Sequence, residues 1–164
     1  CIRDSSKTII VKIGSSLIIN DKKIIRKKWL LEFAKDIKAL RKKNKNIIIV
    51  SSGAIALGCK KLNIAKKKLK IDQSQAVASV GQIELMNLFK EVFAIQKINI
   101  SQILLTLEDT EIRRRAINAK RTIENLFNLN FIPIVNENDT IATSEIKYGD
   151  NDSCLLYTSP SPRD

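Results

Sequence analysis

The chain has 164 residues, of which 44% are hydrophobic and 28% charged, and this balance is typical of a globular domain rather than a disordered segment. No run approaches the roughly 18 consecutive apolar residues of a membrane span, and the N-terminus lacks the order of a signal peptide, so we expect a cytoplasmic protein with no membrane contact. The net charge of +12 raises nucleic acid as a partner, but the basic residues form short clusters with little aromatic interleaving, which favours solvated faces.

The first predicted element is a buried strand at Thr8–Ile13, bounded by Gly14 and Ser15 in a tight turn. Lys12 interrupts this apolar run close to the glycine. A lysine in a mostly buried strand is rare without an anionic partner, so we expect Lys12 to face a phosphate at the end of the strand. The alternative is a lysine whose ammonium reaches solvent from an edge strand.

The combination of a buried strand followed by a Gly/Ser turn then occurs a second time. Apolar residues at helical spacing predict a helix over 24–43 with a stop at Asn44, and Ile47–Val50 is a second buried strand. Ser52 and Gly53 follow it directly and lead into another helix. Two Gly/Ser turns side by side at the carboxyl ends of parallel strands would form a phosphate cradle, because free N–H groups at a helix start attract anions.

Further helices are predicted from Asp72, which with Gln75 resembles a capping box, to about Gln96, and over 116–128. Gly81 within the first of these is expected to permit close packing, and Asn130 to end the second in the left-handed conformation.

The remaining strands are predicted at 101–106 and 131–135, and a hairpin arm or flap at 143–148. Pro133 cannot donate to a ladder, so we expect the 131–135 strand at the sheet edge. Strands separated by helices predict an α/β fold, a three-layer αβα sandwich with a mainly parallel sheet.

A dense cluster of carboxylates and carboxamides lies between Asn136 and Asp152. Crowded carboxylates repel one another, and a cation or polar ligand would relieve that repulsion. The alternative is an ordinary Asn/Asp-rich surface loop.

The residue inventory excludes several chemistries. The chain has no histidine, which removes His-based triads and His metal sites, and its three separated cysteines indicate neither a disulfide framework nor a zinc site. Neither the P-loop nor the dinucleotide fingerprint is present. Lys12, two Gly/Ser turns and a carboxylate-rich loop suit phosphoryl transfer, in which a protein mainly positions substrates and offsets charge.

Four motifs resemble the amino acid kinase family and, within it, the glutamate 5-kinases. They are VKIGSSLI at 11–18, IIIVSSGAIALG at 47–58, QAVASVGQ at 75–82 and NENDTIATSEIKYGDND at 136–152. The resemblance implies a phosphotransferase that moves the γ-phosphate of ATP, with Mg²⁺, to the side-chain carboxylate of L-glutamate, forming L-glutamyl 5-phosphate in the first step of proline biosynthesis. It also implies proline as a feedback inhibitor and a homo-oligomer at full length.

The resemblance also implies residue roles. Lys12 would neutralise the transferring phosphoryl group, and Asp152 would hold catalytic lysines in place. The implied glutamate contacts come from one residue after the second strand and four in the polar cluster: Ser52, Asn136, Asp139, Asp150 and Asn151. The implied ATP and phosphate contacts come from the two turns and the first strand: Lys12, Gly14, Ser15 and Gly53. No residue is assigned to a metal.

The resemblance runs from about Thr8 to Asp152, and it implies that residues 1–152 form the N-terminal, glutamate-binding part of an amino acid kinase domain. Residues 153–164 depart from the pattern, and we interpret them as a non-native tail. We expect such a piece to be inactive alone, because the family's nucleotide site lies mostly beyond it. Two alternatives remain: another amino acid kinase, such as acetylglutamate kinase, or a basic nucleic-acid-binding module.

Overall fold

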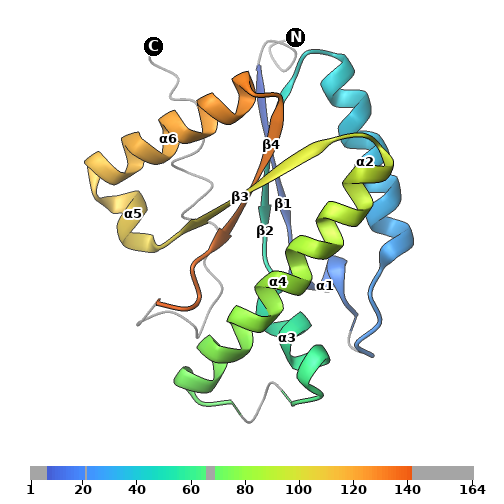
Figure 1. Cartoon of the computed structure of the whole chain (residues 1–164), viewed down its shortest axis with the longest axis vertical. Helices are drawn as coiled ribbons and strands as arrows, with labels where there is room; N and C mark the ends of the chain where they lie inside the picture. Colours follow the sequence, from blue (N-terminus) through green and yellow to red (C-terminus); the bar gives the residue numbers. More distant parts are fainter. Residues whose placement is uncertain (1–6, 21, 66–68, 142–164) are drawn as a thin grey trace.

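In the part of the chain that the structure describes, four parallel strands form a sheet at the centre of the molecule (Figure 1). The computed structural model describes residues 7–20, 22–65 and 69–141. The strands lie in the order β1-β2-β4-β3, with bounds β1 (Thr8–Ile13), β2 (Asn46–Ser51), β3 (Asn99–Leu105) and β4 (Phe131–Glu137). Because every pairing is parallel, the carboxyl ends of all four strands meet at one edge of the sheet.

In the described residues, six helices connect and cover these strands. Their bounds are α1 (Ser15–Ile18), α2 (Lys27–Lys42), α3 (Ala54–Leu62), α4 (Ile71–Ile95), α5 (Leu107–Glu111) and α6 (Arg113–Asn128). In Figure 1, α2 and α4 lie on one side of the sheet and α6 on the other. The predicted three-layer αβα sandwich with a parallel sheet is therefore confirmed.

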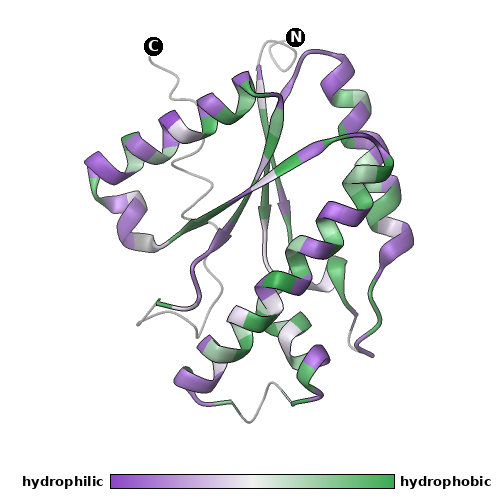
Figure 2. Ribbon diagram, in the orientation of Figure 1, coloured by the Kyte–Doolittle hydropathy of each residue, from purple (hydrophilic) through white to green (hydrophobic). Residues whose placement is uncertain are grey.

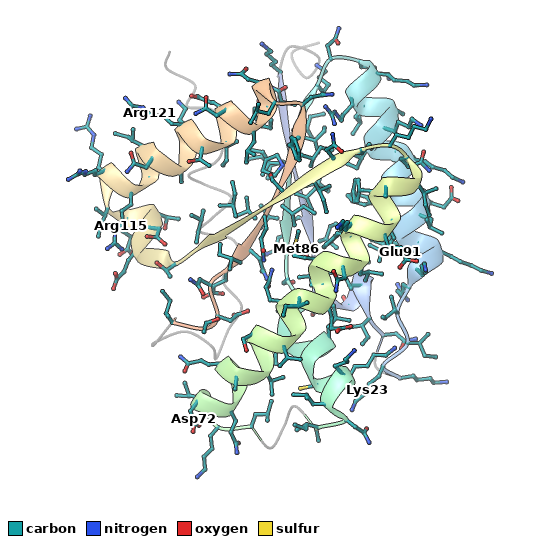
Figure 3. All side chains as sticks on the ribbon, viewed as in Figure 1. Lys23, Asp72, Met86, Glu91, Arg115 and Arg121 are labelled. Carbon is teal, nitrogen blue, oxygen red and sulfur yellow. The ribbon has the colours of Figure 1, made fainter. Side chains whose placement is uncertain are left out.

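Alternate residues of the central strands enter two different cores. Ile47 and Ile49 of β2 pack with the buried faces of α2 and α4, whereas Ile48 and Val50 pack with Ile123 of α6. A strand buried on both faces needs an unbroken apolar run, which explains the sequence of β2. The helices are apolar toward the sheet and polar outside (Figure 2), and Figure 3 shows Glu91 and Arg121 extending outward on opposite sides of the molecule.

Two glycines let α3 and α4 approach each other closely. A Cβ on Gly81 would lie 1.7 Å from the carbonyl oxygen of Ala54, and one on Gly58 would lie 2.1 Å from the carbonyl oxygen of Val77. Both distances are far below van der Waals contact, so only glycine fits at either position. The expectation that Gly81 permits close packing is confirmed.

The predicted edge position of the 131–135 strand is wrong. β4 lies between β2 and β3, and Pro133 is on a central strand. Pairing with β2 registers only Ile134 and Val135, directly after the proline. One missing ladder bond costs on the order of 1 kcal/mol, whereas burying a single isoleucine contributes about 1.5–3 kcal/mol. Ile132 and Ile134 are each 1% exposed, so burial outweighs the lost donor.

The predicted capping box at Asp72 and Gln75 is also wrong. Helix α4 begins at Ile71, and the backbone N–H of Lys70 donates to Gln73 Oε1 at 3.0 Å. This is half a capping box, because a lysine ammonium has no lone pair with which to accept the reciprocal bond.

Two other helices begin at different residues from those predicted. Helix α2 begins at Lys27 rather than 24, since Ile25 instead forms a bridge with Ile19. Helix α6 begins three residues early, at Arg113, because the chain turns at Ile112 directly after α5. Asn130 is left-handed as predicted, with φ 65°.

The predicted flap at 143–148 lies outside the described residues. Within the ranges that the structure describes, no helix combines the length and apolar character required to cross a bilayer.

Candidate functional site at the carboxyl edge of the sheet

The two Gly/Ser turns lie against each other. The backbone N–H and the hydroxyl of Ser52 both donate to the carbonyl oxygen of Ile13, at 3.2 and 3.3 Å. A Cβ on Gly53 would lie 3.4 Å from the Cβ of Ser15. The prediction that the turns after β1 and β2 come side by side is therefore confirmed, although the first turn continues into the short helix α1.

The structure of the chain requires glycine in only one of these two turns. Gly53 has φ 116°, a conformation that side chains rarely adopt, so the backbone itself requires it. Gly14 has an ordinary φ of −71°, and the nearest atom to a Cβ there is Ser16 Oγ at 4.0 Å. Neither conformation nor packing requires glycine at position 14, which leaves room for a group from outside the chain.

Helix α3 begins directly at the second turn. Its N-cap is Gly53, which has no side chain to satisfy the first N–H groups of the helix. These groups and the positive end of the helix dipole form an anion-attracting end beside the Ser15 turn.

Lys12 lies one residue before the end of β1 and is exposed. It registers with Val50 of β2 and is on the same side of β1 as Ile10, which packs toward the α6 layer. Among the strands that the structure describes, β1 is at the edge, so Lys12 can extend over the carboxyl edge without desolvating its charge. This position suits both the phosphate interpretation and the edge-strand alternative.

Asn136 lies at the end of β4 and is 2% exposed. Its Nδ2 donates to Oε1 of Gln82, on helix α4, at 2.7 Å. The Nε2 atom of Gln82 is buried and has no hydrogen-bond partner. The Asn136 side chain therefore fixes the amide oxygen of Gln82, while the amide nitrogen of Gln82 stays unsatisfied.

The polar loop begins with a turn fixed to the end of β3. The N–H of Asn138 donates to the carbonyl oxygen of Leu105 at 2.8 Å, and the N–H of Ile141 closes a turn on Asn138 at 3.2 Å. Asp139 lies in this turn and is partly exposed. The predicted site residues Asp150, Asn151 and Asp152 lie outside the described residues.

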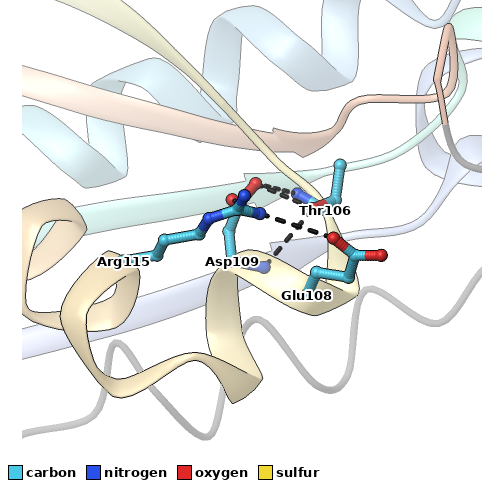
Figure 4. Close-up of polar contacts among 4 residues, drawn as sticks. All are labelled: Thr106, Glu108, Asp109 and Arg115. Carbon is cyan, nitrogen blue, oxygen red and sulfur yellow. Dashed lines mark hydrogen bonds and ion pairs between the residues drawn. The ribbon is translucent and has the colours of Figure 1, made fainter.

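A second group of polar side chains is hydrogen-bonded together just after the end of β3 (Figure 4). Its members are Thr106, Glu108, Asp109 and Arg115. Both the N–H and the hydroxyl of Thr106 donate to Asp109 Oδ2 at 2.8 Å, and the N–H of Asp109 donates to Thr106 Oγ1 at 3.3 Å. Arg115 donates to Asp109 Oδ1 at 3.2 Å and to Glu108 Oε2 at 3.4 Å. Arg115, from the Arg113–Arg115 run, thus contacts acids of this chain.

The pKa of Asp109 reflects competing effects. Burial raises it, but the hydrogen bonds from Thr106 and the charge of Arg115 outweigh burial, so the pKa lies below its ordinary value. The ionised carboxylate therefore holds the start of α5 and, through Leu105, the strand end to which the Asn138 turn is attached.

Sequence reasoning did not identify Gln82 as part of the site. The glutamine ends the QAVASVGQ motif, one residue after Gly81, and a polar residue beside an obligatory helix glycine was the available signal. Its partner is 54 positions away, which no local pattern reveals.

In the part of the chain that the structure describes, no three Asp, Glu, Cys or His side chains gather to hold a metal ion. The described residues thus supply no metal cage, and none of them is assigned as a Mg²⁺ ligand.

Comparison with known sequences shows which proteins the chain is similar to. A model of the amino acid kinase family matches residues 7–158. The chain is 78% identical over 147 residues to the glutamate 5-kinase of Pelagibacter ubique (strain HTCC1062), covering 90% of this chain and 40% of that protein. It is 48% identical over 149 residues to the glutamate 5-kinase of Ruegeria sp. (strain TM1040), with the same coverage. The chain thus spans about 40% of the length of these relatives.

Two solved structures share the fold at low sequence identity. A Giardia carbamate kinase superposes with a TM-score of 0.52 at 11% identity, over 80% of this chain and 60% of that one. The product complex of a T. acidophilum isopentenyl phosphate kinase gives a TM-score of 0.51 at 9% identity, over 79% and 54%. At these identities the likeness concerns the fold alone.

Proposed function

The chain belongs to the amino acid kinase family, and from this premise we propose that it carries the amino-acid-binding part of an enzyme that phosphorylates the side-chain carboxylate of L-glutamate with ATP. The observation that carries the proposal is the contact between the two Gly/Ser turns, with Gly53 against Ser15 and open space at Gly14. The relatives named glutamate 5-kinase support the choice of substrate.

The phosphate side of the proposed site uses the two turns. The start of α3 after Gly53 offers N–H groups to the phosphoryl oxygens, and the absence of a Cβ at Gly14 lets the backbone come close to them. Ser15, in the first turn, lies against Gly53 of the second turn. Lys12, extending over the same edge, would neutralise charge on the phosphoryl group as it passes to the acceptor.

The glutamate side uses the loop after β4. An amino acid's ammonium group needs acceptors, and Asp139 is a carboxylate at the start of that loop. Ser52 directly follows β2, the strand that pairs with β4, where it can contact the acceptor. Asp150 and Asn151 are proposed to complete the glutamate contacts, and Asp152 to orient lysines.

No general base is required by this proposal. The attacking carboxylate is already ionised near neutral pH, so the protein has to orient it and reduce repulsion from the phosphoryl oxygens. Mg²⁺ would accompany ATP and offset phosphate charge when bound, as the family suggests.

A chimaera tests the proposal. Residues 7–152 replace the matching segment of the Pelagibacter ubique glutamate 5-kinase, and ATP-dependent acyl-phosphate formation is measured with glutamate, N-acetylglutamate and carbamate. We expect turnover with glutamate alone. Activity on N-acetylglutamate but not glutamate would replace the proposal by another amino acid kinase.

Two substitutions in the chimaera separate the proposed roles. Asp139→Ala should chiefly raise KM for glutamate, whereas Asp152→Ala should chiefly lower kcat. If both altered only KM for ATP, the assignment of the loop to glutamate would be wrong. The 164-residue chain by itself should show no turnover.

A further inference from the structure

An unsatisfied amide lies at the carboxyl edge of the sheet. Gln82 Nε2 is buried without a hydrogen-bond partner, while Oε1 of the same side chain accepts from Asn136 Nδ2 at 2.7 Å. A buried donor left without an acceptor has lost its hydrogen bond to water and gained none in return. Proteins seldom retain such a group unless something else binds it.

Packing between helices sets the position of this amide. Gly81 lies directly on the first turn of α3, where a Cβ would be 1.7 Å from the Ala54 carbonyl oxygen. The next residue, Gln82, is thereby held near the start of α3, which begins directly after Gly53. The side chain cannot move away freely, because Asn136 is 2% exposed and fixes its oxygen.

The amide lies on the opposite side of the sheet edge from Lys12. Asn136 continues the alternation of Ile132 and Ile134, which pack toward the α2 and α4 layer, whereas Lys12 alternates with Ile10 toward the α6 layer. A substrate placed between them would present its reacting end to Lys12 and its other end to Gln82.

We propose that Gln82 donates its Nε2 hydrogen bond to the α-carboxylate of the amino-acid substrate and so helps to determine which substrate is phosphorylated. Asn136 is the positioning residue that fixes the amide orientation. This inference rests on the proposed function, since the amino acid is its ligand. A neutral donor in a buried position suits a carboxylate, because it stabilises the anion without adding a second buried charge.

The substitution Gln82→Glu tests the Nε2 donor of Gln82 separately from the oxygen that accepts from Asn136. It keeps an oxygen where Asn136 Nδ2 donates and replaces the amide nitrogen by a second oxygen, which cannot donate and repels a carboxylate. In the chimaera described above we expect KM for glutamate to rise about tenfold to a hundredfold, with KM for ATP unchanged. Gln82→Leu should raise KM for glutamate less, because it removes the donor without adding charge.

Asn87→Asp is the matched control, because it makes the same amide-to-carboxylate change at an exposed position of the same helix. It should leave both KM values unchanged. Isoglutamine, whose α-carboxylate is replaced by an amide, identifies the contacted end. The parent should bind it much more weakly than glutamate, and Gln82→Glu should reduce that preference at least about fivefold.

The outcomes separate the two proposals. A chimaera without turnover on glutamate overturns the proposed function and this inference with it. Turnover on glutamate with an unchanged KM in both Gln82 variants overturns the inference alone. Lowered melting temperatures with parallel changes in KM for glutamate and ATP would assign Gln82 a purely structural role, which also contradicts it.

Discussion

A Cβ on Gly81 would lie 1.7 Å from the carbonyl oxygen of Ala54 and 2.6 Å from the backbone nitrogen of Gly58. The contact joins α4 to the first turn of α3, which begins at the proposed phosphate turn. The same contact therefore supports the fold and sets the position of the site.

Gly81→Ala should destabilise the protein strongly. The added methyl group meets backbone atoms that cannot rotate away, and the expected loss is about 3 kcal/mol, larger than the roughly 1 kcal/mol that alanine gains over glycine in a helix. Urea unfolding of the chain measures it. An unchanged midpoint would show that α3 and α4 do not pack as described.

Gly14→Ala is the matched control for the Gly81 substitution and a prediction in its own right. The φ of −71° and the 4.0 Å clearance allow a methyl group, so stability should be unchanged or rise by about 0.4–1 kcal/mol. In the chimaera, KM for ATP should nevertheless rise about tenfold or more, because the backbone no longer reaches the phosphates. Normal ATP kinetics would remove Gly14 from the site.

Lys12→Met should act on turnover rather than on stability. Lys12 is exposed, so the melting temperature should hardly change. If its charge stabilises the transferring phosphoryl group, kcat in the chimaera should fall about 10²–10³-fold. Lys35→Met, at an exposed position of α2, serves as the control and should leave kcat unchanged. Equal kcat values in the two variants would support the edge-strand interpretation of Lys12.

The Asp109 cluster predicts a pH-dependent contribution to stability. The pKa of Asp109 is lower in the folded protein than in the unfolded chain, so the ionised form stabilises the fold. That contribution is complete above the unfolded pKa of about 3.9 and is lost as pH falls through the lowered folded pKa. The side chain is 27% exposed, so we expect a modest effect.

Asp109→Asn should therefore lower the free energy of unfolding by about 1 kcal/mol at pH 7, and the difference should shrink as pH falls below about 4. Urea titrations from pH 7 to pH 3 measure this. Glu124→Gln, which changes an exposed carboxylate on α6, is the control and should show little difference at any pH. If the difference in free energy of unfolding between the parent and Asp109→Asn grew toward low pH, the predicted direction of the Asp109 pKa shift would be wrong.

The sequence by itself determined the four strands, the longer helices and the class of fold, but not the short helices α1 and α5. The runs at Thr8–Ile13 and Ile47–Val50 predicted strands that the structure places at Thr8–Ile13 and Asn46–Ser51. The helix glycine at 81 and the left-handed Asn130 were also predictable. These features depend on burial periodicity and on backbone preferences, which act over a few residues and are therefore visible in a local pattern.

Only the tertiary structure decided which strand is central and which side chains meet. Pro133 suggested an edge strand, but the burial of Ile132 and Ile134 between β2 and β3 outweighs one lost ladder bond. The Gln82–Asn136 pair joins residues 54 positions apart, one on α4 and the other at the end of β4. Such contacts arise from the summed packing energy of whole layers, so no single segment of the sequence contains them.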